Sequence, residues 1–150
     1  MIRFAALALL AGLLAAHPSP ANAEAQSADL APEAVAFVQD QRLGANLEGM
    51  AIRVARATQT YAMLPAGSAE REIRRLLPKY QSRWDANLAR AYARHLSPDE
   101  LRSLAAQGSA SPHAAKLRQL RPLVGDEMQR LSKPLLTELV TEALKAAAGT

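Results

Sequence analysis

The longest regular pattern of apolar positions lies in the C-terminal third of the chain. At about 100° per residue its members fall within an arc of roughly 100° on a helix surface, the width of a face that packs on a core. The pattern predicts one long C-terminal helix in which Pro122 and Pro134 each cause a bend, and it leaves open whether either proline splits the helix. The members of this stripe, at intervals of three or four residues, are Leu117, Leu120, Val124, Met128, Leu131, Leu135 and Leu139.

The same spacing predicts shorter helices near the start of the chain. Pro32 has the geometry of a first helical residue, and we expect Gly44 to end or bend this helix near residues 41–43. A second helix is predicted from about Asn46 to Ala62, because its apolar residues alternate at spacings of three and four.

A third helix is predicted over residues 69–95. Pro78 interrupts it, and we expect a kink or a break there, because proline cannot donate to the carbonyl four residues back. The apolar residues that keep helical phase on one side are Ile73, Leu77, Tyr80, Trp84, Leu88 and Ala91.

A strong helix-start signal follows at Ser97-Pro98-Asp99-Glu100. Ser97 suits the N-cap, Pro98 the first helical position, and Glu100 completes a capping box with Ser97. We predict a short helix over residues 98–107, ended by Gly108.

The first 23 residues have the organisation of a cleavable signal peptide. Arg3 gives a positively charged start, residues 4–16 are an apolar run, and Ala21-Asn22-Ala23 has the small residues of a cleavage site. The run is shorter than the ~20 residues that span a bilayer, which argues against a membrane anchor. We expect cleavage after Ala23 and a periplasmic or secreted protein.

The rest of the pattern indicates one helical domain at residues 24–150, with a loose terminus at residues 24–31. No window alternates apolar and polar residues with a period of two. We predict an all-α fold, a small bundle of about five to six helices with a long C-terminal helix and no membrane-spanning segment. The chain has no cysteine, so neither disulfides nor thiolate zinc sites are expected.

One stretch of the chain carries a family resemblance. Residues 80–144 contain Leu96-Ser97-Pro98-Asp99-Glu100-Leu101, followed by Ser111-Pro112, Lys116 and Pro122. In this order, after a signal peptide, the residues resemble the exported all-helical bacterial family catalogued as domain of unknown function 2059. The chain resembles a divergent member, because Ala114 stands where members often have glycine. The resemblance implies an all-α fold and an envelope location, and it brings no catalytic residue.

One cluster of polar residues has the composition of a catalytic site. His95 lies near Tyr92, Asp99 and Glu100 in the sequence. The two carboxylates also suit the first turn of a helix, and His95 suits the last turn of the preceding one. Because no nucleophile motif accompanies them, structural roles are favoured and no catalytic residue is assigned.

Metal and cofactor sites are not predicted. Between residues 24 and 150 the only histidines are His95 and His113, and no acidic loop has the spacing of a calcium site. The glycines are scattered singly, so no phosphate-binding loop is expected.

A row of cations on the predicted helix at residues 69–95 is the candidate binding site. At about 100° per residue the row falls within an arc of roughly 140° opposite the apolar face. Such a row suits an acidic protein or an anionic envelope surface, although any solvated helix face has the same pattern. Nucleic acid is not expected as a partner of an exported protein. The row consists of Arg71, Arg75, Lys79, Arg83, Arg90 and Arg94.

These observations favour a non-enzymatic envelope protein that binds a protein or an anionic surface. The alternatives are a hydrolase-like enzyme with a site near His95, and a self-associating structural protein. An apolar groove without converging titratable groups would favour the binding module, and a pocket around His95 would favour the enzyme. Self-association would use the apolar C-terminal residues Leu135, Leu136, Leu139, Val140 and Leu144.

Overall fold

The computed structural model describes residues 30–149, so the predicted signal peptide at residues 1–23 lies outside the described part of the chain. The described residues form helices joined by turns, with no β-strand among them, which confirms the predicted all-α fold. The helices are α2 (Pro32–Asp40), the 3₁₀ helix η1 (Leu43–Asn46), α3 (Leu47–Arg56), α4 (Gln59–Ala62), α5 (Ser68–Ala93), α6 (Pro98–Gln107), the 3₁₀ helix η2 (Gly108–Ala110) and α7 (Ala114–Ala148).

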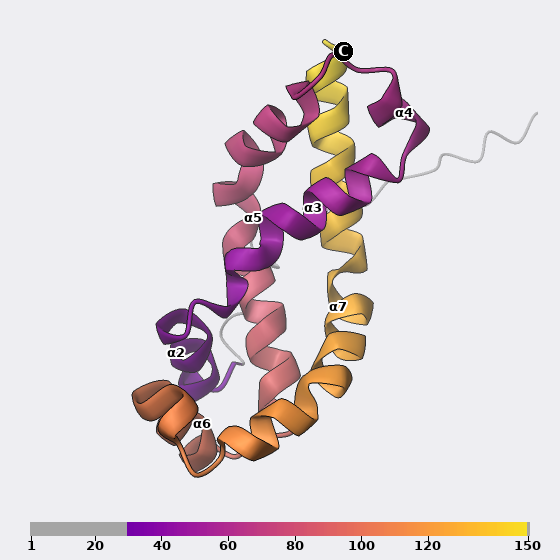
Figure 1. Cartoon of the computed structure of the whole chain (residues 1–150). Helices are drawn as coiled ribbons and strands as arrows, with labels where there is room; N and C mark the ends of the chain where they lie inside the picture. Colours follow the sequence, from indigo (N-terminus) through magenta and orange to yellow (C-terminus); the bar gives the residue numbers. More distant parts are fainter. Residues whose placement is uncertain (1–29, 150) are drawn as a thin grey trace, which may run out of the picture.

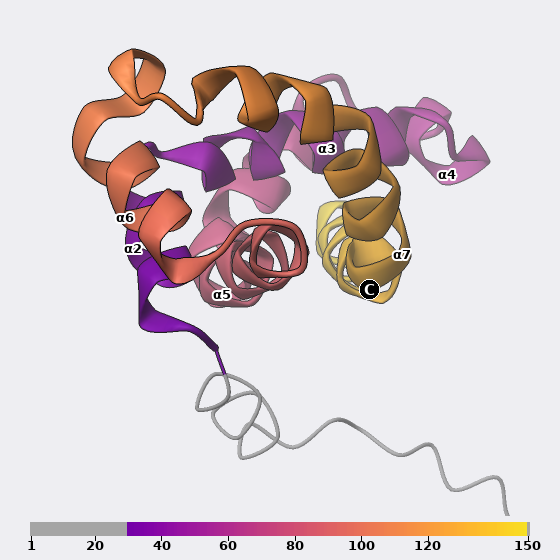
Figure 2. The ribbon, with the colours of Figure 1, turned by 90° about the horizontal axis from the view of Figure 1, so that it is seen from below.

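Helices α5 and α7 are the two longest elements, and they run antiparallel beside each other (Figure 1). Helix α3 lies across one side of this pair and contacts both members. Helix α2 packs on α5 on the side away from α7, and α6 packs on α2 (Figure 2). The N-terminal part of α7 curves toward α6 (Figure 1). None of the helices within residues 30–149 has the length and hydropathy needed to cross a membrane.

The predicted stripes supply most of the core. On α5 the core side chains include Ile73, Tyr80 and Trp84, all at most 3% exposed. The stripe of α7 is buried at its positions 124, 128, 135 and 139, but Leu131 is only half-buried. Ser132 takes the buried place beside it and is 1% exposed. The prediction of a continuous apolar face is therefore wrong at this one turn.

The three helix-interior prolines do not split their helices. Helix α5 continues through Pro78, and α7 continues through Pro122 and Pro134. A proline in a helix leaves the carbonyl four residues earlier without its hydrogen bond. All three prolines and the residues four positions before them are exposed, so water can bond to the freed carbonyls. The predicted alternative of a break at Pro78 is wrong.

The predicted second helix ends earlier than expected. Helix α3 stops at Arg56 because Thr58 has an extended backbone, and its hydroxyl donates to Ala55 O at 2.7 Å. The same oxygen accepts from Tyr61 N at 3.2 Å, so Thr58 is also the N-cap of α4. A local side-chain bond of this kind competes with helix continuation.

Gly44 does not end the first helix as a left-handed cap. Helix α2 stops at Asp40, and the left-handed residue is Arg42, with φ of 49°. Gly44 is buried in η1, where a Cβ atom would lie 1.8 Å from Asp85 Oδ1. Glycine is needed there because η1 packs closely on α5.

The predicted capping signals of α6 are confirmed. Ser97 Oγ accepts from Glu100 N at 3.3 Å, and Glu100 Oε2 accepts from Ser97 N at 2.8 Å. Pro98 is the first helical residue. Gly108 ends the helix with φ of 53°, a left-handed value that favours glycine.

Candidate functional site

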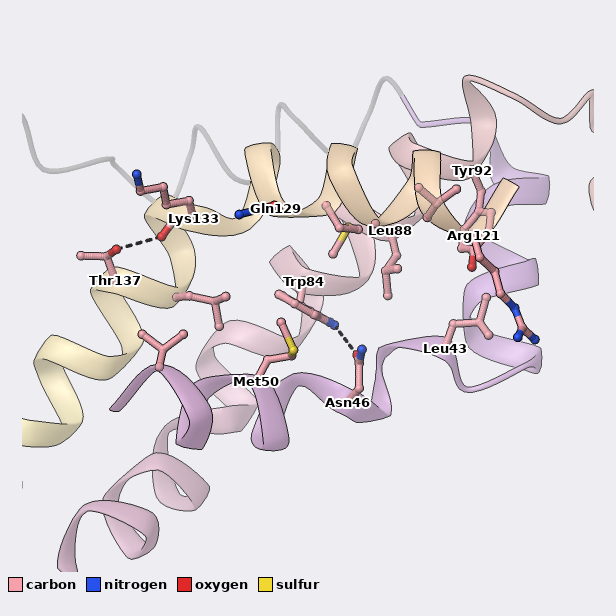
Figure 3. Close-up of a pocket in the computed structure, with 15 residues that line it drawn as sticks. Leu43, Asn46, Met50, Trp84, Leu88, Tyr92, Arg121, Gln129, Lys133 and Thr137 are labelled. Atoms are coloured by element: carbon pink, nitrogen blue, oxygen red, sulfur yellow. Dashed lines mark hydrogen bonds between the residues drawn. The ribbon is translucent and has the colours of Figure 1, made fainter. Parts of the chain in front are cut away.

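A cavity of about 710 Å³ lies between α3, α5 and α7 (Figure 3). Its volume is within the range of ligand-binding pockets, and most of its lining side chains are apolar. We call it the groove. It is lined by Leu43, Asn46, Met50 and Val54 before and along α3, by Trp84, Leu88 and Tyr92 of α5, and by Arg121, Val124, Gly125, Met128, Gln129, Lys133, Leu136 and Thr137 of α7.

Helical spacing explains why these side chains meet. Met50 and Val54 are four residues apart on α3, and Trp84, Leu88 and Tyr92 are successive four-residue steps on α5. Residues four apart lie on one side of a helix, one turn above the other. Each helix therefore presents a line of side chains to the same space.

Trp84 forms part of the apolar wall. It is 3% exposed, and its Nε1 donates to Asn46 Oδ1 at 3.1 Å (Figure 3). Because the only polar atom of the indole is paired, the ring offers an apolar surface. Met50 and Met128 line the groove too, and their flexible thioether side chains adapt to ligands of different shape.

Two cations stand at opposite ends of the groove, Arg121 and Lys133, with Gln129 between them on α7 (Figure 3). Within residues 30–149, none of these three side chains makes a hydrogen bond or an ion pair with another residue. The set of lining residues contains no aspartate and no glutamate. The groove therefore combines apolar walls with uncompensated positive charge.

Tyr92 lies beside Arg121 at one end of the groove (Figure 3). Its ring packs edge-on against Phe37, with ring centroids 5.1 Å apart. Burial raises the pKa of the Tyr92 phenol, and the positive charge of Arg121 acts in the opposite direction. The phenol is therefore protonated at neutral pH and has a proton to donate.

Half of the predicted cationic row pairs with carboxylates of α7. Lys79 Nζ lies 2.6 Å from Glu142 Oε2, and Arg83 Nη1 lies 3.0 Å from Glu138 Oε2. We call this polar contact line between α5 and α7 the seam; it also includes an ion pair of 3.0 Å between Arg94 Nη1 and Glu127 Oε1. The partner numbers fall as the α5 numbers rise, as expected for antiparallel helices.

Uncharged groups also join the two helices along the seam. Tyr80 is fully buried, and its hydroxyl donates to Glu142 Oε2 at 2.6 Å. Burial and the hydrogen bond to Glu142 raise the pKa of this phenol. Asn87 Nδ2 donates to the Oγ of buried Ser132 at 3.1 Å and to Leu131 O at 3.3 Å.

The other members of the row lie along α5. Arg75 pairs with Glu72 one turn away at 2.7 Å, and Arg90 Nη1 donates to Asn87 Oδ1 at 3.2 Å. Arg71 is exposed. The row is therefore largely paired with protein groups, and its role in anion binding stays a prediction.

The residues around His95 do not converge on one point. Glu100 accepts from Lys116 Nζ at 2.7 Å besides capping α6, and Asp99 pairs with Arg102. Tyr92 points to the groove, and His95 is not among the groove's lining residues. The hydrogen bonds to Lys116 and to Ser97 N lower the pKa of the Glu100 carboxyl, which suits a structural carboxylate.

In the described part of the chain, no group of three or more histidine, aspartate or glutamate residues is arranged to hold a metal ion. The sequence did not reveal the groove, because only the cations of one helix, residues 69–95, were considered as a binding site. One available signal was the spacing of Arg121 and Lys133 beside the apolar stripe of α7.

Comparison of this chain with family models, with curated proteins and with solved structures gives no match. The resemblance to the exported helical family named above therefore stays a prediction. The functional argument depends on the groove and its surroundings.

Proposed function

We propose that this protein is an exported, non-enzymatic binding module, and that the groove between α3, α5 and α7 is its binding site. The supporting observation is a largely apolar cavity of about 710 Å³ that no carboxylate and no histidine lines. Trp84 and Met128 give it the character of a site for apolar groups, since burial of apolar surface drives such binding.

The groove also distinguishes this function from the enzymatic alternative. Catalysis by acid and base groups needs at least one such group within hydrogen-bonding reach of the reacting atoms. No carboxylate and no histidine lines the groove, and its titratable side chains are Tyr92 and the two cations Arg121 and Lys133. The composition of the walls suits retention of a ligand rather than its conversion.

Gly125 allows the groove to be blocked without disturbing the fold. It lies inside α7 and lines the groove, and a Cβ atom added there would meet no atom within 4 Å. Gly125→Leu therefore adds a side chain at the wall of the groove without a clash at its Cβ. It also replaces glycine by a better helix former, which favours the fold by up to about 1 kcal/mol.

The test is binding of N-phenyl-1-naphthylamine, a neutral apolar dye, followed by energy transfer from Trp84. Trp84 is the only tryptophan of the chain, so the transfer places the dye near the groove. We expect saturable binding that Gly125→Leu weakens by at least tenfold, about 1.4 kcal/mol. Gly49→Leu is the matched control, because Gly49 lies inside α3, outside the groove, with equally open space at its Cβ.

Two results would count against the proposal. One is dye binding that the Gly125→Leu and Gly49→Leu variants weaken equally, and the other is no saturable binding at all. Export is tested separately, by intact mass of protein recovered outside the cytoplasm. The expected mature chain begins near Glu24, and recovery of only full-length chain would contradict export by cleavage.

A further inference from the structure

The two ends of the groove differ in how their polar groups are arranged. At one end, the guanidinium of Arg121 and the phenol of Tyr92 lie next to each other (Figure 3). Within residues 30–149 neither group has a hydrogen-bond partner. At the other end lies Lys133 of α7, and no polar side chain of α5 lines the groove beside it (Figure 3). The first end therefore offers two donors on neighbouring side chains next to an apolar wall.

We infer that the groove binds a single-chain anionic amphiphile, with its carboxylate at Arg121 and Tyr92 and its alkyl chain along Trp84 and Met128. This inference rests on the proposed function of the groove and adds the chemical class of the ligand. A fatty-acid-like molecule has one charged end and one long apolar body. The groove has apolar walls and a cation at each end, and Arg121 is the cation that has a second donor, Tyr92, beside it.

Charge complementarity carries the choice of an anionic head group. A guanidinium offers two parallel N–H donors that match the two oxygens of a carboxylate. The protonated phenol of Tyr92 supplies a third donor. Since no lining residue is acidic, an anion at this end meets no repulsion from the walls, whereas a cationic head group would meet Arg121.

The length of the groove suits an extended alkyl chain. Arg121 and Lys133 are twelve residues apart on α7, which corresponds to about 18 Å along a helix. The groove holds about 710 Å³. Its wall residues Trp84 and Val124 are 3% and 4% exposed, so they form the bottom of the groove.

The test is displacement of bound N-phenyl-1-naphthylamine by three ligands with the same twelve-carbon chain, each below its micelle-forming concentration. We expect dodecanoate to displace the dye at least tenfold more effectively than dodecanol, and dodecyltrimethylammonium to be the weakest. Each additional buried CH₂ contributes about fourfold in affinity, so dodecanoate should bind about fifteenfold more tightly than decanoate. The advantage of dodecanoate over dodecanol should shrink as salt is raised.

Two variants test the head-group position. Arg121→Gln should remove the preference for dodecanoate over dodecanol while leaving dodecanol binding unchanged. Arg118→Gln is the control, since Arg118 is an exposed cation one turn earlier on α7 that does not line the groove. Tyr92→Phe keeps the ring and removes the donor, and it should weaken dodecanoate binding several-fold more than dodecanol binding.

The outcomes separate this inference from the proposed function. Equal displacement by dodecanoate and dodecanol would overturn the anionic ligand and leave the apolar binding site intact. A preference for dodecanoate that the Arg121→Gln and Arg118→Gln variants reduce equally would overturn the head-group position. Displacement by an acidic amphipathic peptide, with none by dodecanoate, would show a protein ligand instead. Absence of dye binding would remove the proposed function itself.

Discussion

The seam and the groove both lie between α5 and α7, and both place cations beside apolar side chains. In the seam, Lys79 and Arg83 each face a glutamate of α7 at 2.6 and 3.0 Å. In the groove, no carboxylate lines the walls beside Arg121 and Lys133, and within residues 30–149 neither cation makes an ion pair. Where the neighbouring helix supplies a carboxylate, a cation links the two helices. Where no carboxylate lies nearby, the cation is available to a ligand.

Packing explains why the two regions coexist on one helix pair. Along the seam, α5 and α7 contact each other directly, and Asn87 binds Ser132 across the interface. Helix α3 crosses the pair and supplies the third wall of the groove, and α7 curves along its N-terminal part (Figure 1). Substitutions in the seam should therefore change stability, and substitutions in the groove should change binding.

The largest expected effect concerns the apolar core that lies beside the seam. Leu139 is fully buried on α7, so Leu139→Ala should lower the free energy of unfolding by about 2–5 kcal/mol through loss of contacts and a residual cavity. Leu131→Ala, two turns earlier and half-buried, should cost about 1 kcal/mol or less. Denaturant titration measures both. Equal losses would mean that the two positions are buried to the same extent in solution.

The next effect concerns the polar contact across the seam. Asn87→Ala removes the donor to Ser132, whose hydroxyl is buried, and should lower stability by about 1–3 kcal/mol. Adding Ser132→Ala to the Asn87→Ala variant removes the buried hydroxyl that has lost its donor, and it should restore part of the lost stability. Thermal melts of the single and double variants give the coupling energy, and simple additivity would show that the two side chains do not interact.

Charge reversal separates the paired cations from the unpaired ones. Lys79→Glu replaces an ion pair by two like charges, because residue 79 faces Glu142. The loss of stability should be only about 1 kcal/mol, since ion pairs near the surface contribute little. Arg71→Glu, at an exposed member of the same row, should change it by less than about 0.5 kcal/mol. Identical melting temperatures for the two variants would show that the Lys79 contact does not hold the seam.

The smallest effect is a difference in acid sensitivity. The hydrogen bonds from Lys79 and Tyr80 lower the pKa of the Glu142 carboxyl below its ordinary value of 4.5. A lowered pKa in the folded state means that ionised Glu142 stabilises the fold above that pH, and that this contribution is lost as the pH falls through the folded-state pKa. Between about pH 5 and about pH 3, wild type should lose more stability than Glu142→Gln. Parallel pH profiles from denaturant titrations would contradict this.

The local sequence determined the helix start at α6 and the apolar faces of α5 and α7. Ser97, Pro98 and Glu100 act on backbone groups within three residues of each other, so their roles follow from spacing alone. The phase of Ile73, Tyr80 and Trp84 fixed which side of α5 turns inward. Such features depend on helix geometry, which is the same in every fold.

Only the tertiary structure decided which cations are neutralised and where the core stays open. Lys79 is 63 residues from Glu142, and no periodicity within α5 identifies that partner. The position of Gly44 against Asp85 likewise depends on how η1 meets α5. Helical periodicity fixes the direction in which the Trp84 side chain leaves the axis of α5, but not the distance from α5 to the next helix. The spacing of Trp84 in the sequence would therefore be the same whether α3 and α7 covered it or left a groove beside it. The candidate site therefore arises from the curvature of α7 and the crossing of α3.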